Sequence, residues 1–325
     1  MTQGKTVLVL GGGIGGTVAA TRLRRMLPRE HRVVLVERQP QYVFSPSFLW
    51  MMIGQRGADQ ISRPMRALAK HGIELIQGTI ERIDPVARSV RVDGKELSGD
   101  YLIVALGADL APDLIPGLAQ AGHNFYTLEG AGSLRDARLK VQSSRVVVLV
   151  SAMPFKCPGA PNEAAMLLEY DFRKRGVRDR VRLDLYTAEP GPMPVAGSVV
   201  SGALRQMIES KGIGYHPNHV VTAVDPAQHR ISFANGATAD FDLLAYIPPH
   251  RAPQVVRDAG LCADSGWVPV DRGTLETKFP GVYAIGDVTG IMLTSINKPL
   301  PKAGVFADNE SEVVAQNIAR AISGK

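Results

Sequence analysis

Short apolar runs alternate with amphipathic segments along this chain. Residues 6–10 and 145–150 are aliphatic runs, and each leads through a turn into a segment whose apolar positions have helical spacing. Uninterrupted runs of this length are typical of strands that are buried on both faces of a parallel sheet. We therefore predict strands at both runs, followed by helices over about 14–27 and 162–175, and a further helix over 303–323.

The same order of segments occurs twice. Four segments of the first copy have counterparts with similar residues in the second copy. They are 71–73, 83–85, 93–94 and 100–104, which correspond to 211–213, 224–226, 235–236 and 242–246. A repeat of domain size indicates a tandem duplication. We predict an α/β fold with two tandem Rossmann-like, three-layer ββα domains. The first is expected to be discontinuous, with residues 1–108 and 243–325, and the second, residues 109–242, is inserted between these parts.

Only the first copy keeps a glycine-rich turn. Gly11, Gly13 and Gly16 match the G-x-G-x-x-G pattern between a strand and a helix, where glycines allow a tight turn and close approach of a pyrophosphate. Glu37 ends the next strand, where a carboxylate can bind an adenosine ribose, and Arg38 follows as a further candidate contact. The spacing favours a bound dinucleotide over a glycine turn without a ligand.

The equivalent turn of the second copy has lost its glycines. Ser151, Met153 and Lys156 stand at the three glycine positions, and Pro154 lies between them. Side chains at this turn would collide with an approaching pyrophosphate, and proline has no N–H to donate to it. We therefore expect that NAD(P)H does not bind here, so that a smaller donor reduces the cofactor.

A cysteine follows the altered turn. We expect Lys156 and the N-terminus of the next helix to lower the pKa of the Cys157 thiol, which indicates a redox role, although a small buried apolar residue is the alternative. Glu163 is a candidate proton carrier or a solvent-exposed helix carboxylate. Cys262 is expected to be structural.

Composition excludes several classes of function. The 325 residues are 45% hydrophobic and 21% charged, with a net charge of +6. Aromatic residues make up only 6%, which argues against nucleic-acid binding, and two cysteines cannot form a disulfide framework. The seven histidines show no metal-ligand spacing, so no metal is expected. With neither a signal peptide nor an 18-residue apolar run, we expect a cytoplasmic protein, or one peripheral on the inner face of the cell membrane.

Two further motifs resemble those of flavoproteins with two dinucleotide-binding domains. Residues 277–288 contain T-x-F-P-G-V-Y-A-x-G-D and resemble the second FAD fingerprint, which includes Gly286 and Asp287. Residues 101–107 resemble the intermediate A-T-G motif, with Ala105 and Gly107 retained and leucine in place of threonine. The resemblance implies a glutathione-reductase-like fold and FAD as the cofactor.

Other segments narrow the resemblance. The sequence P-F-K-C-P-x-A-P-x-E at 154–163 is similar to the active-site segment of sulfide:quinone oxidoreductases and of the flavoprotein subunit of flavocytochrome c sulfide dehydrogenase. Residues 44–50, which include Ser45 and Pro46, resemble the flavin-side loop of the quinone-linked branch, and residues 298–304 also resemble a family segment. The resemblance implies that Cys157 carries sulfur as a persulfide, that Lys302 lies near the flavin, and that sulfide and quinone are the substrates.

The chain departs from the family in three places. Ser45 and Ser47 stand in the loop where the flavocytochrome branch attaches FAD through cysteine, so FAD is expected to be non-covalent. The family's second flavin-proximal cysteine and its C-terminal membrane helices have no counterpart before Lys325. Residues 48–53 are apolar and are read either as a quinone entrance or as packing against FAD.

Two alternative functions stay open: a type II NADH:quinone dehydrogenase, which shares the implied fold, and a flavin-carrying electron-transfer subunit docked to a cytochrome. A peripheral membrane contact and a homo-oligomer also stay open.

Overall fold

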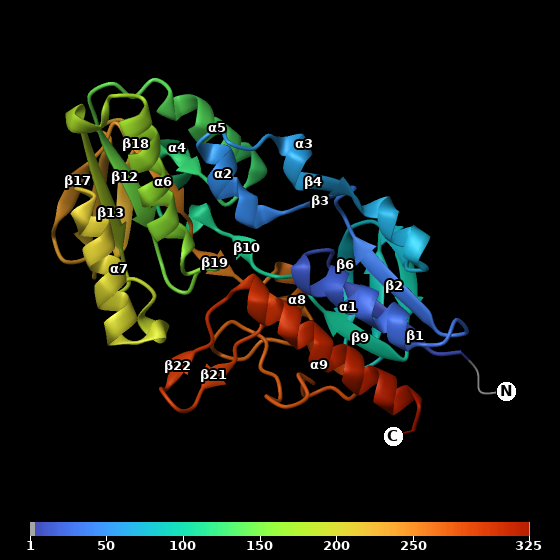
Figure 1. The fold of residues 1–325 in the computed structure, drawn as a ribbon. Coiled ribbons are helices and arrows are strands. Elements are labelled where there is room, and N and C mark those ends of the chain that lie inside the picture. The colour runs from blue at the N-terminus through green and yellow to red at the C-terminus, as the bar shows by residue number, and fades with distance from the viewer. Residues whose placement is uncertain (1–3, 325) are drawn as a thin grey trace. The chain divides into compact units, whose positions relative to one another are not determined.

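In the computed structural model, which describes residues 4–324, the chain forms two units that each contain a five-stranded parallel sheet (Figure 1). Unit 1 consists of the chain up to Tyr42, Arg63–Asp109, and the chain from Arg251 onward. Unit 2 consists of Val43–Ser62 and Leu110–His250.

The sheet of unit 1 has the order β20-β9-β1-β2-β5. Its strands are β1 (Thr6–Leu10), β2 (Arg32–Glu37), β5 (Glu74–Gln77), β9 (Tyr101–Val104) and β20 (Val282–Ala284), and neighbours run parallel. Successive residues of β1 are buried on opposite faces. Val7 packs with α1 (Ile14–Met26) and α9 (Gly304–Ile322), whereas Leu8 packs with the strands β6 (Ile80–Asp84) and β7 (Ser89–Val92). Unit 1 therefore has three layers: the helices α1 and α9, the sheet, and the strands β6 and β7. Figure 1 shows α1 and α9 side by side in the helical layer.

The sheet of unit 2 has the order β11-β18-β12-β13-β14 and is also parallel. Its strands are β11 (His123–Asn124), β12 (Ser144–Val150), β13 (Val181–Thr187), β14 (Gly214–His216) and β18 (Leu243–Ile247). One face packs against α5 (Leu128–Arg138), α6 (Ala160–Lys174) and α7 (Ser198–Ser210). The opposite face packs against the meander β15 (Val221–Asp225), β16 (Arg230–Phe233) and β17 (Thr238–Asp240).

The remaining elements are short. They are β3 (Gln41–Val43), η1 (Ser45–Ser47), α2 (Phe48–Met52), α3 (Ala58–Ile61), β4 (Ser62–Pro64), η2 (Met65–His71), β8 (Lys95–Ser98), β10 (Asp109–Leu110), η3 (Pro112–Leu114), α4 (Leu118–Ala121), η4 (Arg178–Arg180), η5 (Pro194–Ala196), β19 (His250–Arg251), α8 (Gln254–Asp258), η6 (Gly286–Val288), β21 (Met292–Leu293) and β22 (Lys298–Pro299).

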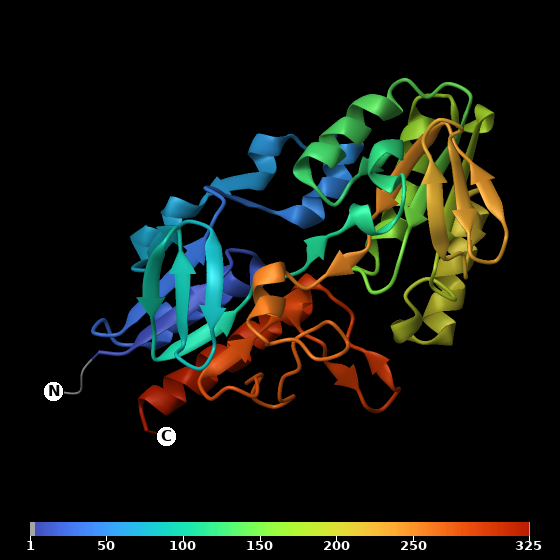
Figure 2. The same cartoon turned by 180° about the vertical axis from the view of Figure 1, so that it is seen from behind.

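The predicted tandem ββα architecture is confirmed. Strands β9, β1, β2 and β5 of unit 1 occupy the same sheet positions as β18, β12, β13 and β14 of unit 2. Each unit also has an antiparallel meander, β6-β7-β8 and β15-β16-β17, and Figure 2 shows them in teal and in yellow to orange. The fifth strand differs between the units, because β20 comes from the C-terminal part of the chain and β11 precedes β12.

Most predicted elements lie within two residues of their expected bounds. The strand at 6–10 and the helix α1 are where the sequence placed them. Helix α6 begins at Ala160, two residues before the prediction, and carries a proline in its first turn. Proline is favoured there because its missing N–H would have no partner inside the helix.

The domain boundaries differ from the expectation at two places. The second part of unit 1 was expected to begin at residue 243, but β18 pairs with β12 and β11, so it belongs to unit 2 and the boundary lies after His250. Residues Val43–Ser62, expected in the first domain, also belong to unit 2. In both cases long-range pairing or packing decides the boundary.

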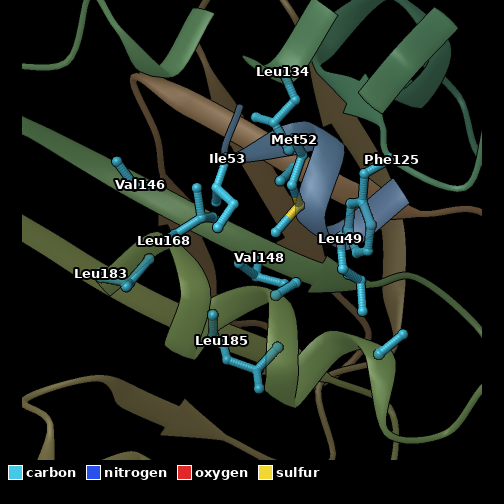
Figure 3. Packing of buried hydrophobic residues seen from close by; sticks show 14 of the residues in the cluster. Leu49, Met52, Ile53, Phe125, Leu134, Val146, Val148, Leu168, Leu183 and Leu185 are labelled. Carbon is cyan, nitrogen blue, oxygen red and sulfur yellow. The ribbon is translucent and has the colours of Figure 1, made fainter. Parts of the chain in front are cut away.

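The apolar run at residues 48–53 forms part of the unit 2 core. Leu49, Met52 and Ile53 are each at most 5% exposed, and they lie among Phe125, Leu134, Val148 and Leu168 (Figure 3). Helix α2 contacts α5 and α6, while Trp50 is half-buried beside Arg56. Packing inside unit 2 therefore accounts for the burial of this run, and the two roles that the sequence suggested stay predictions.

Within the part of the chain that the structure describes, no helix is long and apolar enough to cross a membrane.

Candidate functional site

The candidate cofactor residues of unit 1 gather where neighbouring parallel strands end. Gly11 follows β1, Glu37 ends β2, Ala105 follows β9, and Gly286 follows β20. The carboxyl ends of parallel strands share one edge of a sheet. The chain passes from β1 to β2 on one side of β1, while β9 lies on the other side. This edge is thus a topological switch point, where open α/β sheets bind their ligands.

The glycines of the first turn have two different roles: two allow close backbone packing, and one borders open space. A Cβ on Gly16 would lie 1.8 Å from the Gly11 carbonyl oxygen, and one on Gly11, whose φ is +99°, would lie 2.5 Å from the Ala105 carbonyl oxygen. Both glycines are therefore required by the backbone packing of unit 1. A Cβ on Gly13 would meet nothing within 4 Å, so this position borders open space.

The N-terminus of α1 is suited to an anion. Gly13 is its N-cap, and among the described residues no side chain caps it and no acidic residue lies in its first turn. The first N–H groups of a helix have no partner inside the helix, and the helix dipole favours negative charge there. Together with the open space at Gly13, these groups fit the pyrophosphate of a dinucleotide.

The Glu37 carboxylate is held beside this turn. Its Oε2 accepts a hydrogen bond from Gly12 N at 2.6 Å, and its Oε1 accepts one from Gln39 N at 2.8 Å. A carboxylate has about four acceptor sites, so it retains capacity for ribose hydroxyls. Arg38 is exposed at the end of the strand.

A buried cation lies in the loops after β20. Lys302 Nζ donates hydrogen bonds to the carbonyl oxygens of Asp287 (2.7 Å) and Thr289 (3.0 Å), and it lies 3.4 Å from the ring centroid of Trp267. Lys302 is only 8% exposed. Burial lowers the pKa of its ammonium to about 8, although the negative charges of Asp287 and Glu310 oppose the shift.

Glu310 is a member of this cluster that the sequence analysis missed. It lies on α9 and accepts a hydrogen bond from Gly286 N at 2.5 Å. Burial raises the pKa of its carboxyl group to about 7. The sequence contained a signal for the burial of Glu310, because this residue shares helical spacing with the apolar residues Ala307 and Val314, which are buried on α9. Trp267 had no comparable signal.

The thiol of Cys157 lies in a turn of unit 2 directly before α6. The residue is exposed and has a φ of +58°, in the left-handed region. Phe155, which is 4% exposed, anchors the segment in the core, and the Cys157 carbonyl oxygen accepts a hydrogen bond from Ala160 N at 2.9 Å. Glu163 lies in the first turn of α6 and is half-buried.

The second unit has no glycine cradle at the equivalent turn. Ser151 is 1% exposed, and its hydroxyl donates a hydrogen bond to the Ile247 carbonyl oxygen at 2.6 Å. The Met153 side chain is 49% exposed at the same turn. The Met153 side chain thus stands at the position that corresponds to Gly13, the glycine that borders open space in unit 1.

The second cysteine has a different environment. Cys262 is half-buried against the core beneath the meander of unit 1. Burial raises the pKa of its thiol, although Arg257 opposes the shift. Both properties fit the structural role predicted for it.

The structure divides the predicted site residues between the units. Unit 1 holds Gly11, Gly13, Gly16, Glu37, Arg38, Ala105, Gly107, Gly286, Asp287 and Lys302, whereas unit 2 holds Ser45, Pro46, Cys157 and Glu163. Ser45 and Pro46 are exposed in η1. Among the residues that the structure describes, no cluster of histidine, cysteine or acidic side chains could hold a metal ion.

Comparison with known proteins supports a redox enzyme. The family model of the pyridine nucleotide-disulphide oxidoreductases matches residues 5–302. The sulfide-quinone reductase of Aquifex aeolicus (strain VF5) is 30% identical over 98% of this chain and 77% of its own length. The mitochondrial sulfide:quinone oxidoreductase of Mus musculus is 31% identical over 88% of this chain and 66% of its own length.

A solved structure agrees with these relatives. The sulfide:quinone oxidoreductase from Aquifex aeolicus superposes with a TM-score of 0.88 and 28% identity, over 98% of this chain and 77% of the solved chain. A family of this kind implies a flavin-type cofactor, and the glycine turn, the N-terminus of α1 and Glu37 fit one. The chain is therefore a flavin-dependent member of the pyridine nucleotide-disulphide oxidoreductase family, and within this family it belongs with the sulfide:quinone oxidoreductases.

Proposed function

We propose that this chain binds FAD non-covalently in unit 1, oxidises sulfide through Cys157 and passes the electrons to a quinone. The observation that carries the proposal is the contrast between the two units. Unit 1 keeps an open glycine turn at its switch point, whereas unit 2 has side chains at the equivalent turn and an exposed cysteine after it.

The residues of unit 1 support distinct contacts with FAD. The N-terminus of α1 and Gly13 are suited to the pyrophosphate, and Glu37 is suited to the adenosine ribose. Gly286 and Asp287, in η6, match the fingerprint that meets the ribityl chain. Ser45 and Ser47 offer no thiol for a covalent bond in their loop.

The chemistry at the cysteine balances as a two-electron oxidation. One sulfide and the Cys157 thiol combine into a persulfide, which forms one S–S bond and releases two electrons and two protons. A bound flavin would supply the two-electron acceptor for this step, and a quinone, which takes up two electrons and two protons to become a quinol, would be the final oxidant. Glu163 is half-buried one turn into α6, and we assign it a role in carrying protons. The Lys302 cation stabilises negative charge that develops nearby.

This assignment disfavours NADH as the donor. Ser151 and Met153 leave no cradle for a second pyrophosphate, and Pro154 has no N–H to donate to it. The type II NADH:quinone dehydrogenase alternative requires such a cradle.

An anaerobic flavin titration tests the proposal. Sulfide should bleach the flavin absorbance of the purified protein, whereas NADH at the same concentration should leave it unchanged. Rapid bleaching by NADH without a response to sulfide would overturn the proposal. Steady-state turnover of sulfide with a soluble quinone by the isolated chain separates a complete enzyme from an electron-transfer subunit that needs a cytochrome.

We also propose that the protein works on the inner face of the cell membrane as a peripheral protein. Quinones dissolve in the bilayer, and the net charge of +6 favours attraction to anionic headgroups. Vesicles that contain anionic lipid should co-sediment with the protein, and added salt should release it. Equal co-sedimentation with neutral vesicles would contradict the electrostatic part of this proposal.

A further inference from the structure

Tyr126 lies between β11 and α5 of unit 2 with its ring held on several sides. The residue is 8% exposed. Its ring meets Phe125 edge-on at a centroid distance of 5.3 Å and His250 at 5.8 Å. Its backbone N donates a hydrogen bond to the Asn124 side chain at 3.1 Å. The position of the Tyr126 hydroxyl is therefore set by the core of unit 2.

This hydroxyl contacts the peptide that carries the redox cysteine. Tyr126 Oη donates a hydrogen bond to the carbonyl oxygen of Lys156 at 2.7 Å, and it lies 3.4 Å from the carbonyl oxygen of Cys157. The first distance is that of a well-formed O–H to O hydrogen bond. One side chain thus fixes the backbone on both sides of the Cys157 nitrogen, from 30 residues away along the chain.

The backbone of Cys157 needs such a restraint. Its φ of +58° places a residue with a Cβ in the left-handed region, a strained conformation that persists only where the surroundings hold it. The hydrogen bond from Ala160 N to the Cys157 carbonyl holds one end of the turn. The Tyr126 hydroxyl holds the other end, before the Cys157 Cα.

We propose that Tyr126 is a positioning residue for Cys157: its hydroxyl keeps the cysteine in the left-handed turn and so fixes the direction of the thiol relative to α6. The consequence for sulfide oxidation rests on the proposed function. The thiol placement itself is a property of unit 2 and can be measured without any substrate.

Thiol alkylation of the flavin-loaded protein tests the inference. Tyr126→Phe removes only the hydroxyl, and Tyr170→Phe is the matched control because Tyr170 is 48% exposed on α6 of the same unit. The rate of Cys157 alkylation by iodoacetamide is measured by peptide mass spectrometry across pH 6 to 10. Cys262 reports in the same samples on general loosening of the fold.

In Y126F we expect the rate of Cys157 alkylation at neutral pH to change roughly three- to tenfold, because the released turn no longer holds the thiol in one direction. Cys262 alkylation, flavin content and the unfolding midpoint should stay at wild-type values. The limiting rate of flavin reduction by sulfide should fall by a similar factor.

The outcomes test the positioning role of Tyr126 separately from the proposed oxidation of sulfide. Wild-type alkylation kinetics of Cys157 in Y126F would overturn the positioning role. An equal change in Tyr170→Phe, or a matching change at Cys262, would also overturn it, because the effect would then be a general one. If alkylation of Cys157 changes in Y126F but sulfide fails to reduce the wild-type flavin, the positioning role stands and the proposed function fails.

Discussion

At the scale of single residues, the two cysteines differ in exposure. Cys157 is exposed in a turn, whereas Cys262 is half-buried with a raised thiol pKa. We expect Cys157→Ser to retain FAD and fold but to lose sulfide-dependent flavin reduction by at least a hundredfold, because a hydroxyl is a poor nucleophile at neutral pH. Cys262→Ser is the control and should reduce its flavin at nearly the wild-type rate. Loss of reduction in the Cys262 variant alone would reverse the two assignments.

The buried carboxyl group of Glu189 leads us to predict that the stability of the folded protein depends on pH. It follows β13, is 3% exposed, and burial raises the pKa of its carboxyl to about 7, although a hydrogen bond from Thr187 opposes the shift. A pKa raised in the folded state gives a stabilisation that is complete below the unfolded value of 4.5 and is lost as the pH rises through about 7. The loss amounts to roughly 3 kcal/mol.

Glu189→Gln should remove this loss. Urea unfolding should give the variant and the wild type similar stability near pH 4.5, and the variant should be more stable by up to roughly 3 kcal/mol at pH 8. Glu209→Gln, at a position 44% exposed on α7, is the control and should follow the wild type. Parallel curves for Glu189→Gln and the wild type would show that Glu189 is ionised in the folded protein throughout this range.

At the scale of elements, one arginine joins three helices of unit 2. Arg138 on α5 is 6% exposed, and its Nη1 lies 2.9 Å from both carboxylate oxygens of Asp171 on α6. Its Nε and Nη2 donate hydrogen bonds to the carbonyl oxygens of Met52 and Ile53, at the C-terminal end of α2. Arg138 therefore donates hydrogen bonds to carbonyl oxygens at the C-terminal end of α2, where the helix itself supplies no backbone donors.

Arg138→Met should therefore destabilise unit 2 by about 3–5 kcal/mol, because it leaves the Asp171 carboxylate buried without its main partner. Arg135→Met is the control, since Arg135 lies on the same helix with its side chain 39% exposed and pairs with the exposed Asp136. Urea unfolding measures both. A loss below 1 kcal/mol in Arg138→Met would show that Arg175, whose Nη1 lies 3.7 Å from Asp171, takes over the pairing.

At the scale of the whole molecule, the two units share a strand order but differ in the turn that follows equivalent strands, β1 in unit 1 and β12 in unit 2. Gly13→Val would put a side chain into the open space beside the N-terminus of α1, so we expect flavin to be lost. Met153→Gly is the matched change in unit 2 and should leave the flavin-to-protein ratio unchanged. Absorbance of the purified variants measures this ratio. A stoichiometric flavin content in Gly13→Val would show that the first turn does not hold the pyrophosphate.

Much of the architecture could be predicted because its signals are local or repeat along the chain. The run at 6–10, the glycine spacing and the helix after it depend on neighbours a few residues away, and the structure places β1 and α1 there. The duplication needed only a comparison of the chain with itself, and the two sheets share their strand order. The sequence by itself thus determined the fold class, the glycine turn at a switch point and the cysteine after the altered turn.

The tertiary structure alone decided which distant residues meet. It placed residues 43–62 in unit 2 and kept β18 with the second sheet. It also gathered Trp267 and Glu310 around Lys302 and Gly286, and set the Tyr126 hydroxyl against the Cys157 peptide. Such contacts depend on burial and hydrogen bonding between segments tens of residues apart. Periodicity can indicate that a residue such as Glu310 is buried, but neither periodicity nor motif spacing identifies the distant partner that it meets.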